Sequence, residues 1–526
     1  MACGQEQTKG SAAPQGRVDA ETAAVQEPAK DALSTAGETA EDVKQEETVV
    51  LEGKTGPGTG AAAGELHTYG WDEAVVYEAE DGELLGNARL EGDHVTGLAE
   101  DGDGLRLQVS VEASGFYDLD FITEGQGGYK ENYVFVDGGA MGNIVTDGSG
   151  YVDAVISRVY LEAGSHTVEV KKFWGWINID RLLVKPSDDI DPVMYQLPYT
   201  LVNANADENT RRLFSYLVDN YGNHILSGQY CDTGMLGAES AAVESVAGDY
   251  PAILGLDLIE YTPSRVAHGS KGNQTELAID YWNKGGIVTF CWHWNAPEKY
   301  LSGVWYSGFY TEHTDIDLAR IMNGQDPEGY DLLMADIDAI ARELQKMQEA
   351  GVPVLWRPLH EASGGWFWWG AAGPEAYKKL YVLLYEKLTE EYGLNNLIWI
   401  WNGQDREWYP GDAYVDIIGE DIYPGEHVYT PQTDRFFEAA GYTPARKMVV
   451  LSENGCLFDP ELAARDGAWW GFFCTWQREF VRRDTAIVSY SEQYTEKDMV
   501  RKVYEDERVI SRSELPDLKA YPIGGQ

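Results

Sequence analysis

Two glutamates in this chain directly follow apolar runs that have the character of buried strands. Residues 352–356 are apolar, and the polar side chains of His360 and Glu361 come next. Residues 448–451 form a second apolar run, which leads into Glu453. Parallel strands that are buried on both faces have such sequences, and barrel enzymes keep their catalytic side chains at the carboxyl ends of these strands. The pattern predicts two carboxylates that act together.

The neighbours of the two glutamates favour different charge states. Glu361 precedes a tryptophan-rich loop at residues 366–369, which would exclude water and keep the carboxyl protonated. Glu453 lies between Ser452 and Asn454, whose polar groups suit an ionised carboxylate. Hydrolysis of a glycosidic bond with retention needs one protonated and one ionised carboxyl, about 5–5.5 Å apart. We therefore expect Glu361 to be the general acid/base and Glu453 to be the nucleophile.

The carboxyl-terminal part of the chain, residues 195–526, alternates apolar runs with helical patterns. Helices are predicted at 332–350 and 375–392, among others. The strand-like runs are 225–230, 252–258, 286–293, 352–360, 397–401, 415–419, 448–451 and 471–476. Eight strand–helix units over this length predict an α/β fold, a (β/α)8 TIM barrel. Glu361 would end its fourth strand and Glu453 its seventh, on opposite sides of the barrel.

Four short motifs in this part resemble glycoside hydrolase family 26. They are WHW at 292–294, WRPLHE at 356–361 followed by Trp366, VDIIGEDIY at 415–423 and SENG at 452–455. The family consists chiefly of endo-β-1,4-mannanases with a (β/α)8 barrel. The resemblance assigns the acid/base role to Glu361 and the nucleophile role to Glu453, as the residue types do.

The resemblance also implies a set of side chains around the sugar that is cleaved. In this sequence they are His293, His360, Trp366, Tyr423 and Trp476. Tyr423 would donate its hydroxyl hydrogen to the nucleophile, and Trp476 would form the floor of the subsite. As alternatives, His360 could be a structural core histidine and Trp476 a packing residue.

Two further acidic residues compete for a catalytic role, because Glu420 and Asp421 end the expected sixth strand. Strand alternation lets only one of them face the barrel axis together with Tyr423, and that one is Asp421. We expect both to support the site without reacting. The sequence has no glycine-rich phosphate loop, Cys/His cluster or nucleophilic serine motif, so no cofactor is expected for catalysis.

The function expected from these residues is a retaining endo-β-1,4-mannanase. It would hydrolyse internal bonds of mannan, glucomannan or galactomannan by double displacement. A related endo-glycanase acting on β-glucan or β-1,3-xylan remains an alternative, since the motifs do not separate these substrates. A surface glycan-binding protein without turnover is a third, although the presence of both glutamates argues against it.

Residues 71–187 have a different pattern, with short alternating runs separated by glycine and aspartate. This predicts an all-β sandwich. The stretch resembles a family 35 carbohydrate-binding module, a jelly roll, through YEAE at 77–80, LEAGSHTV at 161–168 and WGWINID at 174–180.

Two groups of residues in this module are candidate binding sites. The resemblance implies a structural calcium ion held by Glu78, Glu80 and Asp180, and a solvated acidic edge is the alternative. We expect Glu78 and Glu80 to point to the same side of one strand, where a cation with oxygen ligands would relieve their repulsion. By the same alternation Trp174, Trp176 and Asn178 would face one side and bind sugar, the two indoles by stacking and the amide by hydrogen bonding.

Residues 1–68 contain no Phe, Tyr or Trp and are rich in Ala, Glu, Gly and Thr, so they are expected to form a disordered acidic tether. Cys3 near its start is typical of a bacterial lipoprotein, unless it is there by chance. We therefore expect a secreted or cell-surface bacterial protein, anchored by a lipid on Cys3, and a monomer. The formal net charge of −47 opposes binding to nucleic acid but is compatible with a neutral polysaccharide. The 17 Trp and 32 Tyr favour a carbohydrate partner, although core packing accounts for many of them.

Overall fold

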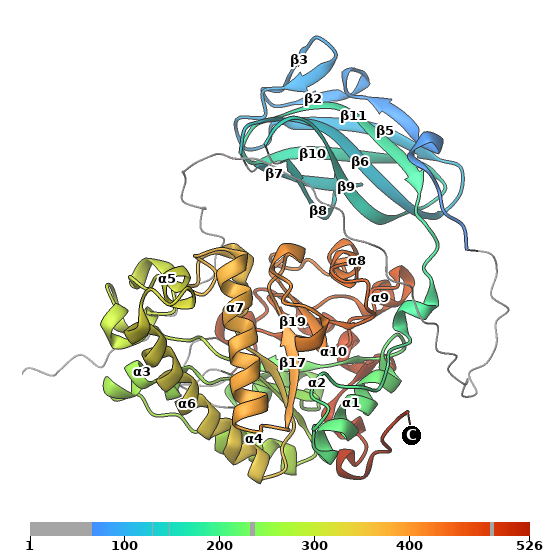
Figure 1. Cartoon of the computed structure of the whole chain (residues 1–526). Coiled ribbons are helices and arrows are strands. Elements are labelled where there is room, and N and C mark those ends of the chain that lie inside the picture. Colours follow the sequence, from blue (N-terminus) through green and yellow to red (C-terminus); the bar gives the residue numbers. More distant parts are fainter. Residues whose placement is uncertain (1–65, 129, 147, 232–236, 484–488, 526) are drawn as a thin grey trace, which may run out of the picture. The chain divides into compact units, whose positions relative to one another are not determined.

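The computed structural model describes residues 66–526, except 129, 147, 232–236, 484–488 and 526 (Figure 1). The expected tether, including Cys3, therefore lies almost wholly outside the described residues. Within the described part, no helix combines the length and the apolar character needed to cross a membrane. The described residues form a β-sandwich and a barrel, each with its own hydrophobic core.

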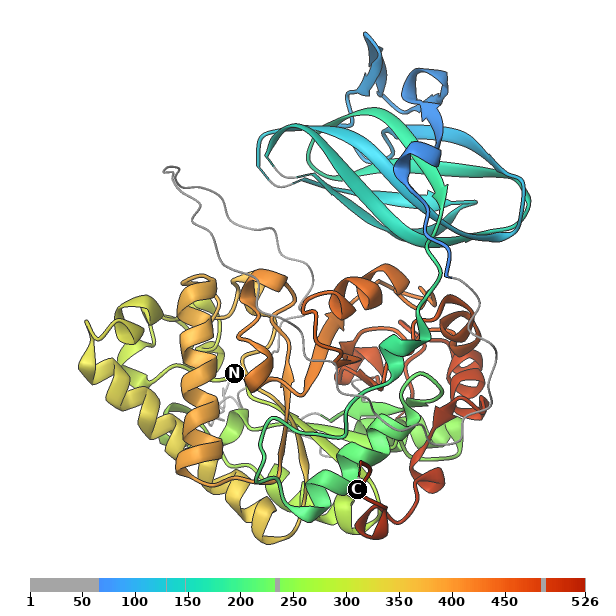
Figure 2. The same ribbon diagram turned by 45° about the vertical axis from the view of Figure 1, so that its right-hand side comes forward.

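The sandwich consists of two antiparallel sheets, which confirms the predicted all-β module (Figure 2). One sheet has the order β3-β4-β11-β6-β9 with β1 paired to β11, and the other has the order β2-β5-β10-β7-β8. The strands are β1 (Val75–Glu78), β2 (Glu83–Leu85), β3 (Arg89–Glu91), β4 (His94–Thr96), β5 (Gly104–Val111), β6 (Gly115–Gln126), β7 (Lys130–Val136), β8 (Gly139–Thr146), β9 (Ser149–Leu161), β10 (Gly164–Trp174) and β11 (Ile177–Pro186). Apolar side chains on the inner faces, such as Leu107, Phe121 and Val168, form the core between the sheets.

The expectation that Trp174, Trp176 and Asn178 share one face of one strand is wrong. Strand β10 ends at Trp174, and Gly175 turns the chain with a φ of 90°. Strand β11 then begins at Ile177 in the other sheet. Trp176 in the turn is 61% exposed, whereas Asn178 is buried and donates to Glu124 at 2.8 Å. Only a glycine adopts this turn without strain, and it interrupts the alternation on which the prediction relied.

The expectation that Glu78 and Glu80 lie on one strand is also wrong. Strand β1 ends at Glu78, and a 3-10 turn (Ala79–Asp81) follows, because Ala79 turns inward and is fully buried. The two side chains are therefore not related by strand alternation.

The second part of the chain is a closed barrel of eight parallel strands, as predicted. In order these are β13 (Gly228–Tyr230), β14 (Ile253–Asp257), β15 (Ile287–Cys291), β16 (Val354–Arg357), β17 (Leu397–Trp401), β18 (Ile417–Ile422), β19 (Met448–Asn454) and β20 (Phe473–Thr475). The expected run at 225–230 is divided, because its first two residues form β12 (Ile225–Leu226), which pairs with β21 (Val509–Ile510) outside the barrel. Glu361 follows the fourth barrel strand and Glu453 lies in the seventh, which is the expected order.

Helices lie outside the ring of strands in both views (Figures 1 and 2). Those in the described residues are α1 (Glu208–Asn220), α2 (Ala238–Ala247), α3 (Pro263–Ala267), α4 (Gln274–Asn283), α5 (Leu318–Met322), α6 (Pro327–Glu349), α7 (Pro374–Tyr385), α8 (Thr433–Ala440), α9 (Pro460–Asp466) and α10 (Lys497–Glu505). The helix predicted at 375–392 is divided in two. Its α-helical part is α7, which ends at Tyr385, and a π-helical turn (Glu386–Glu391) follows directly.

Helix α6 shows how the sequence determines where a helix begins, where it ends and which face it buries. Its N-cap Asp326 accepts a hydrogen bond from the backbone of Gly329 at 3.0 Å, and Pro327 occupies the first turn. Gly351, with a φ of 70°, turns the chain just beyond its end. The helix buries Ile337, Ile340 and other apolar residues on the face that packs against the barrel.

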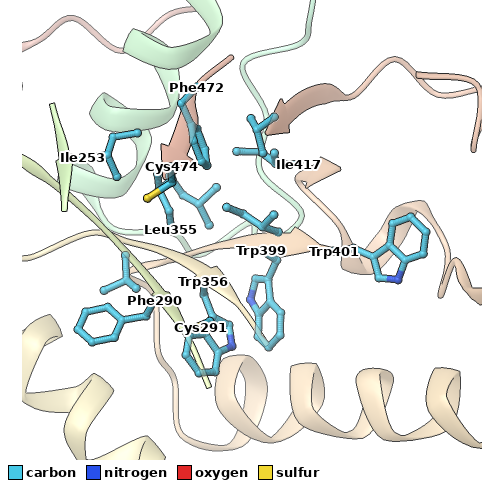
Figure 3. Close-up of a cluster of buried hydrophobic side chains, with 14 of the residues drawn as sticks. Ile253, Phe290, Cys291, Leu355, Trp356, Trp399, Trp401, Ile417, Phe472 and Cys474 are labelled. Atoms are coloured by element: carbon cyan, nitrogen blue, oxygen red, sulfur yellow. The ribbon is translucent and has the colours of Figure 1, made fainter. Parts of the chain in front are cut away.

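Large aromatic and aliphatic side chains fill the space around the strands. Trp356, Trp399 and Trp401 are fully buried and contribute to the cluster shown in Figure 3. Of the 12 largest fully buried side chains among the described residues, nine are tryptophans, so much of the aromatic excess packs the barrel instead of binding sugar. Such a dense frame holds the strand ends rigidly and allows them to fix a site.

Candidate active site

The backbone after β16 places Glu361 in an unusual conformation. Strand β16 ends at Arg357, and both Leu359 and Glu361 have a positive φ, 53° and 52°. Non-glycine residues adopt this region at some energetic cost, and such strain is concentrated at functional sites. Asn402 after β17 holds the turn, because its side-chain oxygen accepts the backbone N–H of Glu361 at 2.9 Å.

The Glu361 carboxyl is desolvated and accepts a hydrogen bond from an indole. Glu361 is 9% exposed, and its Oε2 accepts a hydrogen bond from the indole N–H of Trp366 at 2.8 Å. Burial, followed by the charge of Glu453, raises the pKa of Glu361 to about 7. Glu361 can therefore remain protonated close to neutral pH, as a general acid must.

Glu453 has donors for both of its oxygens. Arg357 donates to Oε2 at 2.5 Å, and the hydroxyl of Tyr423 donates to Oε1. A cation and a hydroxyl in a buried site stabilise the ionised carboxylate. The two glutamates therefore have different surroundings, an indole donor for Glu361 and a guanidinium and a phenol hydroxyl for Glu453.

Arg357 is fully buried and organises the base of the site. Besides Glu453 it binds Asp421 through an ion pair, and it lies 3.2 Å from the hydroxyl of Tyr230. Asp421 also accepts hydrogen bonds from Ser452 at 2.7 Å and Asn402 at 2.9 Å. Every oxygen of Asp421 is therefore occupied by a donor, which leaves it in a supporting role.

Glu420 points away from this network. It is fully buried and pairs with Arg435 on α8 at 2.6 Å. The sequence argument that only Asp421 faces the barrel axis with Tyr423 agrees with this arrangement.

The separation of the carboxylates decides what the site can do. Oxygens of Glu361, Asp421 and Glu453 lie within 4.8 Å of one another. An inverting pair requires about 6.5–9.5 Å to hold a water molecule between the groups, whereas a retaining pair requires about 5–5.5 Å. The observed spacing suits direct attack by one glutamate and proton donation by the other.

The two expected histidines meet beside Glu361. Nε2 of His360 lies 3.3 Å from Nε2 of His293, and the rings are nearly perpendicular. His360 is buried, and burial together with the charge of Arg357 lowers the pKa of its imidazole far below the usual value. The indole of Trp369 donates to the backbone oxygen of His360 at 2.8 Å and fixes its place.

Trp476 lies close to this histidine pair. Its ring centroid lies 5.8 Å from that of His293 and 4.9 Å from that of Tyr230. Trp476 is partly buried, and Trp366 is 48% exposed. All five side chains expected around the sugar therefore gather near the two glutamates, with two indoles open to a ligand.

The residues expected to hold calcium in the sandwich do not form a cage. Within the described ranges, two groups of three acidic, thiol or imidazole ligands have donor atoms within 4.8 Å, and both lie in the barrel. Glu78, Glu80 and Asp180 are not among them, and Asp180 lies 3.3 Å from the guanidinium of its neighbour Arg181. The calcium site stays a prediction that these placements do not test.

Comparison with known proteins supports the interpretation of both parts. The profile of Glycosyl hydrolase family 26 matches residues 202–514, which is more than half of the chain. The chain belongs to glycosyl hydrolase family 26. The profile of Carbohydrate binding module (family 35) matches residues 74–187, the region of the sandwich.

The similarity of this family 26 protein to its relatives extends over most of its length. A mannan endo-1,4-beta-mannosidase from Thermothelomyces thermophilus is 37% identical over 453 residues, which cover 84% of this chain and 90% of the relative. Mannan endo-1,4-beta-mannosidase B from Piromyces sp is 33% identical over 460 residues, covering 84% of this chain and 78% of the relative. The crystal structure of a Podospora anserina GH26-CBM35 beta-(1,4)-mannanase is 36% identical, with a TM-score of 0.60, and covers 85% of this chain and 99% of its own.

Some side chains of this family 26 site could not be singled out from the sequence. Tyr230, Asp257 and Asn402 end or follow three other barrel strands, far from both glutamates in the chain. Asp257 and Asn402 are polar and follow apolar runs, which is the signal that identified Glu361, whereas Tyr230 comes after Ser227, Gly228 and Gln229. That signal occurs at several strand ends, and only the closed barrel shows which of them meet.

Proposed function

We propose that this protein is a retaining endo-β-1,4-mannanase that cleaves internal bonds of mannan, glucomannan or galactomannan. The observation that carries the proposal is the pair Glu361 and Glu453, whose oxygens lie within 4.8 Å while their surroundings favour opposite charge states. The functions given for the relatives from Thermothelomyces thermophilus and Piromyces sp, mannan endo-1,4-beta-mannosidases, support the choice of mannan.

The first step forms a covalent glycosyl-enzyme. Glu453 attacks the anomeric carbon, and the bond to the leaving sugar breaks as Glu361 gives its proton to the departing oxygen. Arg357 and Tyr423 hold Glu453 in place before attack and stabilise its charge. The anomeric centre is inverted once in this step.

The second step releases the sugar. Glu361, now ionised, removes a proton from a water molecule that attacks the anomeric carbon, and Glu453 leaves as a carboxylate. The second inversion restores the β configuration. The first product observed by NMR should therefore be the β-anomer, before mutarotation mixes the two forms.

Replacement of the glutamates tests the mechanism. Glu453→Gln and Glu361→Gln should each lower kcat on mannan by about 1,000-fold or more, because each removes a group that forms or breaks a bond. Glu420→Gln is the matched control, since Glu420 is equally buried but pairs with Arg435 away from the site. Retention of more than a hundredth of the rate by Glu453→Gln, or an initial α-anomer, would overturn the assignment.

A substrate panel separates the alternatives. Release of reducing ends from mannan, β-glucan and β-1,3-xylan should be fastest on mannan. Faster release from either other polymer would identify a related endo-glycanase, and binding without release would identify a glycan-binding protein.

The proposal extends to the cellular setting, supported by the sequence alone. The protein would be secreted or held at the bacterial surface by a lipid on Cys3, with the acidic stretch 1–68 as a tether, and it would act as a monomer. Metabolic labelling with a fatty acid, compared with Cys3→Ala, tests the anchor.

A further inference from the structure

Three polar side chains form a chain of hydrogen bonds across three successive barrel strands. Asp257 is the last residue of β14, His293 follows β15, and His360 follows β16. Oδ2 of Asp257 lies 2.7 Å from Nδ1 of His293, and Nε2 of His293 lies 3.3 Å from Nε2 of His360. The chain therefore runs from a buried carboxylate to the residue next to Glu361.

Asp257 is fixed by more than its contact with the imidazole. Its Oδ1 accepts the backbone N–H of Ile259 at 2.9 Å and that of His293 at 3.1 Å. The side chain is 8% exposed. An ionised carboxylate only accepts hydrogen bonds, so the contact at Oδ2 requires a proton on Nδ1 of His293.

The proton on Nδ1 of His293 determines which nitrogen of His360 is protonated. An imidazole that carries its single proton on Nδ1 has a lone pair at Nε2, and the contact between His293 and His360 then requires a proton on Nε2 of His360. His360 is neutral, because burial and Arg357 hold the pKa of its imidazole far below the usual value. Its Nδ1 then carries no proton and has no hydrogen-bond partner within the described residues.

We propose that Asp257 is a positioning residue that sets the tautomers of His293 and His360 and thereby orients the histidine pair for substrate. The proposal rests on the function proposed above and deepens it. His360 precedes Glu361 in the chain and the ring of His293 lies 5.8 Å from that of Trp476, so the orientation in which the two imidazole rings face a bound sugar depends on the tautomers that Asp257 fixes. A carboxylate that fixes a histidine tautomer has this effect in other enzymes.

A metal ion is a weaker explanation of the same cluster. Asp257, Cys291 and His293 have donor atoms within 4.8 Å of one another. However, burial raises the pKa of the Cys291 thiol well above its usual value, and a metal requires the thiolate. The short contact to Asp257 also occupies Nδ1 of His293, the nitrogen that lies nearest to Cys291, at 4.0 Å.

The substitution Asp257→Asn tests the proposal with little change of shape. The amide can donate to Nδ1 of His293, which places the imidazole proton on Nε2, opposite the N–H of His360. We expect kcat/KM on soluble mannan oligosaccharides to fall about 10–100-fold, as for other partners that orient a functional histidine. In spectra of 15N-histidine protein, the His293 signal, assigned with His293→Gln, should change from protonated to unprotonated at Nδ1.

Asp416→Asn is the matched control. Asp416 is a buried carboxylate that also accepts two backbone N–H groups, from Val202 and Trp399, but it precedes β18 at the opposite end of the barrel. This variant should lose stability and keep both kcat/KM and the His293 spectrum. The spectra need no substrate, so they test Asp257 even if the substrate assignment fails.

Two results would overturn the proposal. One is a kcat/KM for Asp257→Asn within twofold of the unmodified protein. The other is an unchanged His293 signal in that variant, because a loss of activity without a change of tautomer would mean that Asp257 is only structural.

Discussion

At the scale of single residues, opposite surroundings give two identical side chains different roles. Glu361 has one indole donor and loses most of its contact with water, whereas Glu453 receives a guanidinium and a phenol hydroxyl. The charge on Glu453 in turn helps to keep the proton on Glu361, because like charges in a buried site disfavour double ionisation. The roles thus depend on each other and on Arg357.

The pH dependence of turnover should report the Glu361 proton. Only protonated Glu361 can donate to the leaving oxygen, so kcat/KM should fall as the pH rises through about 7, the pKa of Glu361. Trp366→Phe removes an N–H that favours the ionised form, so the pKa should rise and the alkaline limb should move to higher pH. Initial rates from pH 5 to 9 measure the shift.

Trp369→Phe is the control for this prediction. Its indole lies in the same loop but donates to the backbone of His360, so its loss should reduce stability and leave the alkaline limb in place. A limb that moves to lower pH in Trp366→Phe would contradict the proposed effect of the indole.

At the scale of elements, the strands of the barrel were predictable and several of their details were not. Apolar runs such as 397–401 and 448–451 coincide with strands, because a buried parallel strand has no polar alternation. The turn at Gly175 and the 3-10 turn at Ala79–Asp81 were missed, because short local geometry overrides a period of two. The link between Asp257 and His293 depends on closure of the barrel, which sequence patterns do not specify.

Helix α6 contains a carboxyl whose burial has consequences for stability. Asp336 is buried and accepts the indole N–H of Trp294 at 2.8 Å, and burial raises its pKa to about 7. Because the folded state holds this proton more tightly than the unfolded state, stability should decrease as the pH rises from about 4 to 7. Asp336→Asn avoids the buried charge and should be more stable than the unmodified protein by about 1–3 kcal/mol at pH 8. Melting temperatures at pH 5 and pH 8 should differ less in the variant, and an equal difference in both proteins would show that Asp336 does not titrate in this range.

The calcium site in the sandwich remains a prediction. The acidic side chains Glu78, Glu80 and Asp180 would have to turn toward one ion, which would relieve their repulsion. Excess chelator should then lower the melting temperature of the sandwich and leave turnover of short oligosaccharides intact. An unchanged sandwich transition would favour the alternative of a solvated acidic edge.

At the scale of the whole molecule, the strong negative charge restricts the choice of partner. A net charge of −47 repels acidic polymers, and the attraction of a neutral polysaccharide must come from stacking and hydrogen bonding. These forces involve no release of counterions, so binding to mannan should depend little on salt. The exposed indoles of both parts, Trp366 in the barrel and Trp176 in the sandwich, are suited to this task.

The division of labour between the two parts can be tested with one tryptophan. Trp176 is 61% exposed at the turn after β10, so its ring is free to stack on a sugar. Trp176→Ala should lower the affinity for insoluble mannan about tenfold, since burial of part of an indole contributes about 1–2 kcal/mol. Turnover of soluble oligosaccharides should not change, because the two glutamates lie in the barrel.

Trp71→Ala provides the control, since Trp71 is also exposed in this module but its ring is covered by Lys185 at 5.0 Å. Pull-down on insoluble mannan measures both variants, and equal retention of Trp176→Ala and Trp71→Ala would remove Trp176 from the binding surface.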